Sequence, residues 1–226
     1  VCGLCVIPKG MQWMQKDKNY HIDKDLTPKD FFKKYINLDL EEYVSIINSP
    51  TADKPFNKTY TVEMLGNVVG GRDVKHFNLP IERLKELTIK QLQAGETVWF
   101  GSDVSMDSDR KAGILDTDLY HIDDLMHTDN SLTKAERLDY GESAMNHAMV
   151  ITGVDLVDGQ PTKWKVENSW GDKVGEKGYF VMSDEWFSQF VYQIVINKKY
   201  LSPEEREQQT EEPKELAPWD PMGTLA

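Results

Sequence analysis

The sequence predicts an α+β fold, in which mainly helical segments precede an antiparallel, barrel-like sheet. Residues 80–95 carry an amphipathic period typical of a helix. Residues 148–168 carry two strand patterns around a short polar turn. The proline-rich, apolar end of the chain, residues 216–226, predicts an extended C-terminal arm. We therefore expect three parts: a mainly helical part, a barrel-like part, and a helix with the arm, at residues 1–95, 96–200 and 201–226.

The first predicted helix begins after Thr27. Thr27 is a good N-cap, and Pro28 suits the first helical position because its missing N–H is not needed there. Leu26 is placed to pack against Phe31 as a hydrophobic staple. We expect this helix to end near Tyr35.

The second predicted helix is amphipathic and ends at Gly95. Its apolar or buried-facing positions recur at helical spacing and are Ile81, Leu84, Leu87, Gln91 and Leu92. A strand is expected at residues 97–100, followed by a polar loop at residues 101–118. Before this helix, the glycines of residues 66–71 lack the lysine of a phosphate loop and predict a bend.

The central feature is a predicted hairpin that ends in two polar residues. His147 precedes an apolar run at residues 148–152, which is typical of a buried strand. Trp164, Val166 and Asn168 alternate with lysine and glutamate, so Asn168 should point inward. Asp158 and Gly159 predict the tight turn between the two strands. The outer ends of the strands, and with them His147 and Asn168, should therefore lie side by side.

This pairing predicts acid–base chemistry. We expect the Asn168 carboxamide oxygen to accept the His147 Nδ1–H and fix the tautomer, which leaves Nε2 to exchange a proton with a nucleophile. Trp170 could cover that hydrogen bond and exclude water. The alternative for His147 alone is an ordinary, hydrogen-bonded core histidine.

The second half carries further cap and strand signals. Thr133 and Glu136 predict a capping box for a short helix that Gly141 terminates. Strands are expected at residues 179–182 and 191–197. Ser183 should cap the turn between them, and Ser202 should cap a charged helix.

No metal site or cofactor is predicted. The nearest candidate cluster does not have the convergent spacing of a zinc helix, and its members are His121, Asp123, Asp124 and His127. The aspartates of residues 101–118 lack the order of an EF-hand loop. Surface roles are expected for both groups.

Composition excludes some classes of function. The net charge of −12 argues against nucleic-acid binding, which depends on Lys and Arg neutralising phosphates. Two cysteines give no disulfide framework, and no apolar run is long enough to span a membrane. We expect a cytoplasmic protein that does not bind membranes, in which the sequon at Asn57 is only a surface loop.

Several sequence blocks resemble one family. They are G-E-S-A-M-N-H-A-M, T-K-W-K-V-E-N-S-W-G, K-G-Y-F-V-M-S-D-E-W-F, Y-T-V-E-M-L-G-N-V-V-G-G-R and the terminal W-D-P-M-G-T-L-A. In this order they resemble the bleomycin hydrolase and aminopeptidase C family of papain-like cysteine peptidases. The resemblance implies a papain-like fold, peptide substrates, and His147 and Asn168 as catalytic residues. It also implies a homo-oligomer, a hexamer in that family, and an arm whose terminal Ala226 carboxylate meets the amino group of the substrate.

The family's nucleophile block, Gly-x-Cys-Trp, is absent. Neither Cys2 nor Cys5 is followed by Trp, and both lie in an apolar segment where cysteine behaves as a small hydrophobe. We therefore expect the nucleophile on an N-terminal part of the same protein that precedes Val1. A second hypothesis is that this chain is a non-catalytic assembly or regulatory half.

Overall fold

The computed structural model describes residues 10–14, 20–66, 69–71 and 73–224. The chain divides into two compact units, Val1–Glu41 and Glu42–Ala226, which are described separately. Within the described residues, no helix has both the length and the apolar character needed to cross a membrane.

The first unit holds a hairpin and a short helix. Strands β1 (Gly10–Met14) and β2 (Tyr20–Lys24) pair antiparallel. Helix α1 (Pro28–Phe31) continues as a π-helical turn, Phe32–Ile36. The predicted cap is confirmed, since Thr27 accepts from the Asp30 backbone while the Asp30 carboxylate bonds back to Thr27.

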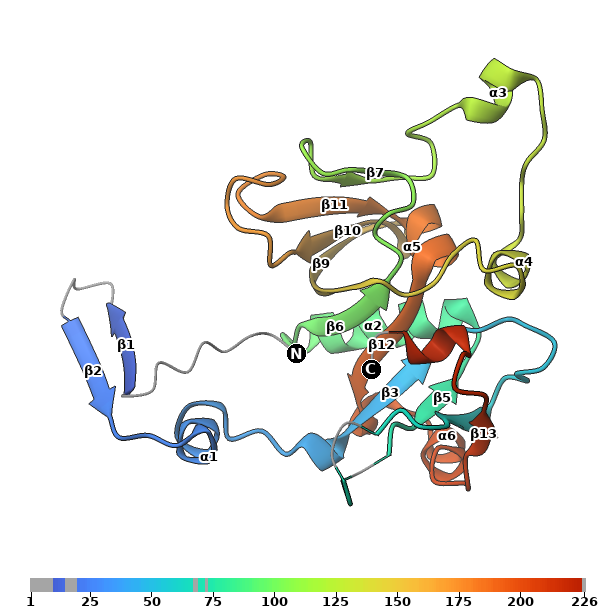
Figure 1. The fold of residues 1–226 in the computed structure, drawn as a ribbon. Helices are drawn as coiled ribbons and strands as arrows, with labels where there is room; N and C mark the ends of the chain where they lie inside the picture. The colour runs from blue at the N-terminus through green and yellow to red at the C-terminus, as the bar shows by residue number, and fades with distance from the viewer. Residues whose placement is uncertain (1–9, 15–19, 67–68, 72, 225–226) are drawn as a thin grey trace. The chain divides into compact units, whose positions relative to one another are not determined.

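The second unit is built on a sheet with eleven strands among the described residues (Figure 1). Their order across the sheet is β13-β4-β5-β3-β12-β6-β9-β10-β11-β8-β7. The strands are β3 (Tyr43–Ile47), β4 (Lys58–Val62), β5 (His76–Asn78), β6 (Val98–Ser102), β7 (Ser108–Asp109), β8 (Ile114–Leu115), β9 (His147–Val157), β10 (Gln160–Glu167), β11 (Tyr179–Ser183), β12 (Val191–Asn197) and β13 (Lys214–Leu216).

Helices and short helical turns connect these strands. They are η2 (Leu40–Glu42), α2 (Ile81–Gln93), α3 (Ile122–Met126), α4 (Lys134–Asp139), α5 (Asp184–Phe190), η3 (Lys198–Tyr200), α6 (Pro203–Gln208) and η4 (Pro221–Gly223). The predicted caps of α4, α5 and α6 are confirmed, because Thr133, Ser183 and Ser202 each accept from a backbone N–H in the first turn.

The α+β class is confirmed, but the sheet is mixed and not simply antiparallel. Three strand pairs run parallel: β3 with β5, β4 with β13, and β8 with β11. Each of these pairs includes a strand of only two or three residues. Such short strands carry too few side chains to show alternation, so the sequence pattern did not reveal them.

The structure also corrects the secondary structure expected at residues 1–95 and 101–118. Strands β3, β4 and β5 belong to the main sheet, so residues 43–78 are not mainly helical and pack with the region expected to start at residue 96. The polar loop at residues 101–118 contains β7 and β8. Backbone pairing between strands outweighs the weak local pattern in both places, with β8 paired to the distant β11 and β7 paired to β8.

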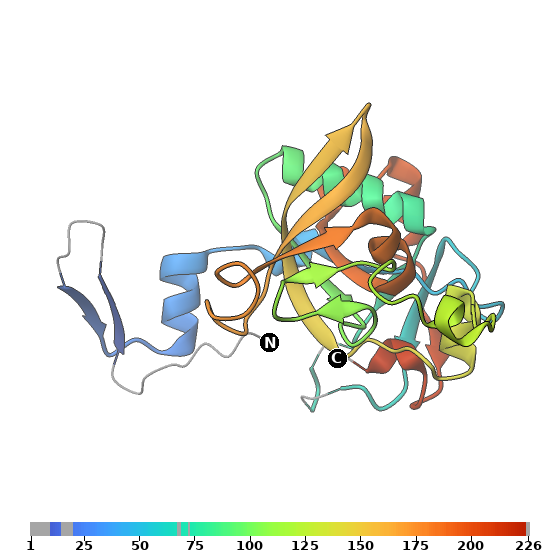
Figure 2. The ribbon, with the colours of Figure 1, turned by 90° about the horizontal axis from the view of Figure 1, so that it is seen from above.

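The core lies between the sheet and two helices (Figure 2). Helix α2 packs on β6, β9 and β12 and buries Leu84 and Leu87 completely, as its period predicted. Helix α5 packs on β10, β11 and β12 through Trp186 and Phe187. This packing fixes the central strands β6, β9 and β10, two of which lead to the candidate site.

Candidate active site

The predicted hairpin exists and places the two polar residues at its open end. Strand β9 pairs antiparallel with β10, and the connecting Asp158 and Gly159 both have positive φ, 51° and 81°. Positive φ at both positions is the conformation that a tight two-residue hairpin turn requires. His147 is the first residue of β9, and Asn168 follows the last residue of β10.

His147 and Asn168 are hydrogen-bonded to each other. The distance from His147 Nε2 to Asn168 Oδ1 is 2.9 Å. The Ser169 N–H donates to the same oxygen over 2.7 Å, and the Asn168 N–H donates to the Gly178 carbonyl over 3.0 Å. Because Oδ1 can only accept, the hydrogen on the imidazole of a neutral His147 belongs on Nε2.

This geometry corrects the predicted orientation of the ring. We expected Asn168 to bind Nδ1 and leave Nε2 free, whereas Asn168 binds Nε2 and leaves Nδ1. Strand alternation determines the face on which a side chain lies, but it does not determine the χ2 rotation that selects a ring nitrogen. Nδ1 of a neutral His147 is therefore the atom that can take up a proton.

An aromatic layer covers the pair. The rings of Trp170 and His147 are stacked, with centroids 4.7 Å apart and planes inclined by 26°. Phe180 meets the Trp170 ring edge to face at 6.0 Å, and the Arg110 guanidinium lies 4.8 Å from its centroid. Such a cover lowers the local dielectric and strengthens the hydrogen bond beneath it.

A buried carboxylate supports the segment before His147, and the sequence did not reveal its role. Asp103 accepts from the Asn146 side chain over 2.5 Å and from the Ser143 hydroxyl over 2.8 Å. Asn146 in turn accepts from the Val104 N–H and donates its own N–H to the Ser102 carbonyl. The sequence showed Asp103 only as the first of several aspartates in a polar stretch, so no local signal distinguished it.

Of the remaining candidates, the structure describes the surface histidine cluster but not the cysteines or the chain end. Cys2, Cys5 and Ala226 lie outside the described residues. His121 faces Asp118 and Asp124 on the surface, and no group of three metal-binding side chains occurs in the part of the chain that the structure describes.

The chain matches the model of the Peptidase C1-like family over residues 6–223. It is 64% identical over 218 residues to an aminopeptidase C of Lactobacillus delbrueckii subsp. lactis, covering 95% of this chain and 49% of that protein. It is 48% identical over 212 residues to an aminopeptidase G of the same organism, covering 94% and 48%. The crystal structure of PepW from Lactobacillus rhamnosis superposes with a TM-score of 0.91 at 66% identity, covering 96% and 50%.

The chain therefore belongs to the Peptidase C1-like family. It is homologous to the aminopeptidase C cysteine peptidases and spans about half the length of the curated relatives it matches.

Proposed function

We propose that the chain is the C-terminal portion of a cysteine aminopeptidase, which removes N-terminal residues from peptides. The chain supplies the catalytic His147 and its orienting Asn168, and a preceding part of the same protein supplies the nucleophilic cysteine. The observation that carries the proposal is the 2.9 Å contact between His147 Nε2 and Asn168 Oδ1, because it leaves Nδ1 available for a thiol. The family and the names of the relatives agree with this chemistry.

In the proposed reaction, His147 Nδ1 takes the thiol proton and the thiolate attacks the peptide carbonyl carbon. The same Nδ1–H then protonates the leaving amine as the C–N bond breaks, which gives a thioester. Nδ1 next takes a proton from water, whose oxygen attacks the thioester carbonyl carbon. As the C–S bond breaks, the amino acid is released with a free carboxyl group, and Nδ1–H returns its proton to the departing thiolate. Asn168 holds the ring so that Nδ1 faces these groups throughout.

The wider expectations belong to the same proposal. They are a papain-like arrangement of the complete protein, the N-terminal part as partner, assembly into a homo-oligomer such as a hexamer, and a cytoplasmic location. No cofactor or metal is needed, because the thiol and the imidazole perform every proton transfer and bond exchange in the scheme.

The C-terminal arm is the proposed specificity element, with the Ala226 carboxylate binding the α-ammonium of the substrate. Met222 is fully buried in one cluster with Met145, which lies two residues before His147. Ala226 is the fourth residue after Met222, and four residue steps of extended chain reach roughly 13–14 Å. This reach is sufficient for a chain end that starts beside Met145 to approach His147.

The test uses the full-length protein and an aminoacyl fluorogenic substrate. His147→Ala should lower kcat/KM by roughly 10²–10⁴-fold or more, since proton transfer and thiol activation are both lost. Asn168→Ala should lower it less, because a misoriented imidazole remains. His121→Ala, an exposed histidine elsewhere, is the matched control. Unchanged activity in His147→Ala would reject the proposal and favour a non-catalytic assembly or regulatory half.

A further inference from the structure

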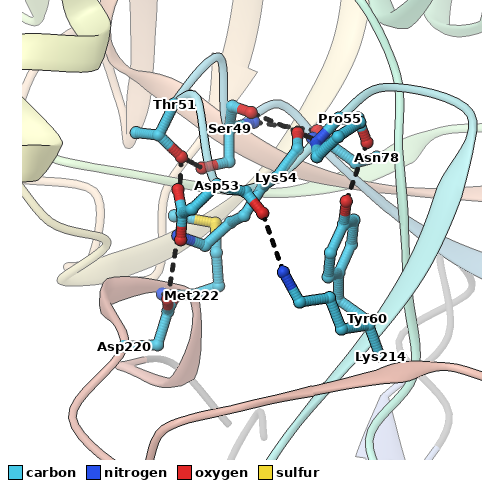
Figure 3. A network of polar contacts seen from close by, with 10 residues as sticks. All are labelled: Ser49, Thr51, Asp53, Lys54, Pro55, Tyr60, Asn78, Lys214, Asp220 and Met222. Carbon is cyan, nitrogen blue, oxygen red and sulfur yellow. Dashed lines mark hydrogen bonds and ion pairs between the residues drawn. The ribbon is translucent and has the colours of Figure 1, made fainter.

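A buried lysine joins the C-terminal arm to the body of the second unit (Figure 3). The side chain of Lys54 is only 4% exposed, and its Nζ lies 2.9 Å from Asp220 Oδ2 and 2.8 Å from Asp53 Oδ2. Asp220 is 10% exposed, whereas Asp53 is 57% exposed. Asp220 is therefore the partner that shares the desolvated environment of the ammonium.

The loop that carries Lys54 is held rigidly. Asn78 donates to the carbonyls of Ser49 and Lys54, over 2.9 and 2.7 Å, and accepts from the Ser49 N–H over 3.0 Å. The Tyr60 hydroxyl donates to the Pro55 carbonyl over 2.9 Å. Because these bonds fix both sides of the loop, the ammonium has a defined position before the arm binds.

The arm meets this ammonium at a fixed register. Strand β13 pairs parallel with β4, from Lys214 beside Tyr60 to Leu216 beside Val62. Asp220 then caps the turn η4 by accepting from the Met222 N–H over 2.9 Å. Met222 is fully buried, and its cluster partners are Ile47, Leu138, Met145 and Tyr192.

We propose that the Lys54–Asp220 ion pair is a clamp that sets how far the C-terminal arm extends toward His147, and so acts as a positioning element for cleavage at the amino end of peptides. This inference rests on the proposed function. Removing the arm would leave the buried ammonium with the exposed carboxylate of Asp53 and a long hydrogen bond of 3.4 Å to the Thr51 hydroxyl, which is an unfavourable state for a desolvated charge. The clamp therefore opposes release of the arm more strongly than apolar contact alone.

The ammonium of Lys54 stays protonated at neutral pH. Burial acts to lower the pKa of its ammonium, but hydrogen bonds and attraction from Asp53 and Asp220 outweigh this effect and raise the pKa above 10.5. The clamp consequently does not open when the pH varies around neutrality.

The first test follows trimming of the full-length protein by a carboxypeptidase, with mass spectrometry of the products. In the wild type we expect digestion to stop at Met222 or Gly223, because Met222 is fully buried and the Gly223 N–H donates to the Asp220 carbonyl over 3.0 Å. In Lys54→Met and Asp220→Asn digestion should continue past residue 220. Asn can still cap the turn at position 220, so the second variant keeps the local fold.

The matched control is Lys58→Met. Lys58 pairs with Glu211 over 2.9 Å at the beginning of β4, but both side chains are well exposed, so its loss should change trimming little. If both clamp variants resist trimming as the wild type does, the clamp inference is overturned.

The second test compares kcat/KM for free and N-acetylated aminoacyl substrates. The ratio of kcat/KM for the free substrate to kcat/KM for the N-acetylated substrate measures the preference for a free amino end. Each clamp variant should lower this ratio at least tenfold, and so should deletion of residues 224–226. If the deletion lowers the ratio and the clamp variants do not, the clamp is wrong while the proposed function stands. If the deletion leaves the ratio unchanged, the arm is not the specificity element, and the clamp loses its functional role. If His147→Ala keeps its activity, the proposed function fails whatever the trimming result.

Discussion

The chemistry of the candidate site depends on which ring nitrogen of His147 remains unbonded. Asn168 Oδ1 binds Nε2, Trp170 covers the ring, and Nδ1 is left for proton exchange. The sequence predicted that His147 and Asn168 bond to each other beneath Trp170, because a buried polar side chain at each end of an apolar hairpin needs a hydrogen-bond partner. It did not predict the ring rotation or the support from Asp103. Both depend on atoms brought together by folding, over forty residues apart in the case of Asp103 and Asn146.

Another histidine should control the acid stability of the chain. His76 is buried, its Nδ1 contacts the Ser45 hydroxyl at 2.8 Å, and Gln193 donates to the same hydroxyl. Burial lowers the pKa of His76 to about 4, against a weaker opposing effect of Asp220. Between pH 6.5 and about 4 the unfolded state therefore binds more protons at this residue than the folded state.

The stability contribution of neutral His76 is complete above pH 6.5 and is lost as the pH falls toward 4, by up to about 3 kcal/mol. Urea unfolding at pH 7 and pH 4.5 measures it. His76→Gln should be less stable than the wild type at pH 7 but should lose less stability on acidification. An equal loss in both proteins would show that His76 does not titrate as described.

At the scale of elements, the loop between β10 and β11 holds the site together. It carries Asn168 and Trp170, and it returns to the sheet where Gly175 donates to the Arg110 carbonyl over 3.1 Å. Gly175 has a φ of 62°, and a Cβ there would lie 2.5 Å from the Tyr179 carbonyl oxygen. This close approach of two backbone segments requires glycine.

Gly175→Ala should therefore lower the free energy of unfolding by about 3 kcal/mol, combining left-handed strain with a backbone clash. Gly171→Ala is the control, because Gly171 also has positive φ but a Cβ there would meet nothing within 4 Å. Its cost should be about 1 kcal/mol. Chemical denaturation of both variants checks the difference, and equal costs would contradict the close-approach argument.

Helix caps and long strands were predictable at this scale, whereas short strands were not. Thr27, Thr133, Ser183 and Ser202 cap helices as the sequence indicated, because capping is a local interaction within one turn. Strands β5, β7, β8 and β13 have two or three residues each. Strands β5, β8 and β13 pair with strands distant in the sequence, and β7 pairs with β8. Two or three residues are too few to show the alternation that identifies a strand in a sequence.

At the scale of the whole molecule, the sheet connects both ends of the second unit. Strand β3 near its beginning and β13 near its end lie on the same side of the central β12. The prolines and apolar residues at the end of the sequence indicated an extended arm, but the parallel pairing of β13 with β4 and the buried contact of Lys54 with Asp220 appear only in the structure. The predicted role of Ala226 stays a prediction.

The 226-residue chain by itself should lack peptidase activity, because neither of its two cysteines, Cys2 and Cys5, stands in the Gly-x-Cys-Trp block of the family. Cys2 and Cys5 should react slowly with iodoacetamide and take no part in hydrolysis. Assays of the purified chain with aminoacyl fluorogenic substrates check both points. Peptide cleavage that disappears in Cys5→Ser would show that the nucleophile lies in this chain after all.

The pairing of His147 with the nucleophilic cysteine is tested most directly by the pH dependence of iodoacetamide alkylation at that cysteine in the full-length protein. If His147 Nδ1 takes the thiol proton, the wild-type cysteine should react with an apparent pKa well below the ordinary value of about 8.5. In His147→Ala the apparent pKa should return toward about 8.5, while His121→Ala should behave as the wild type. The same low apparent pKa in the wild type and in His147→Ala would contradict the pairing of His147 with the thiol.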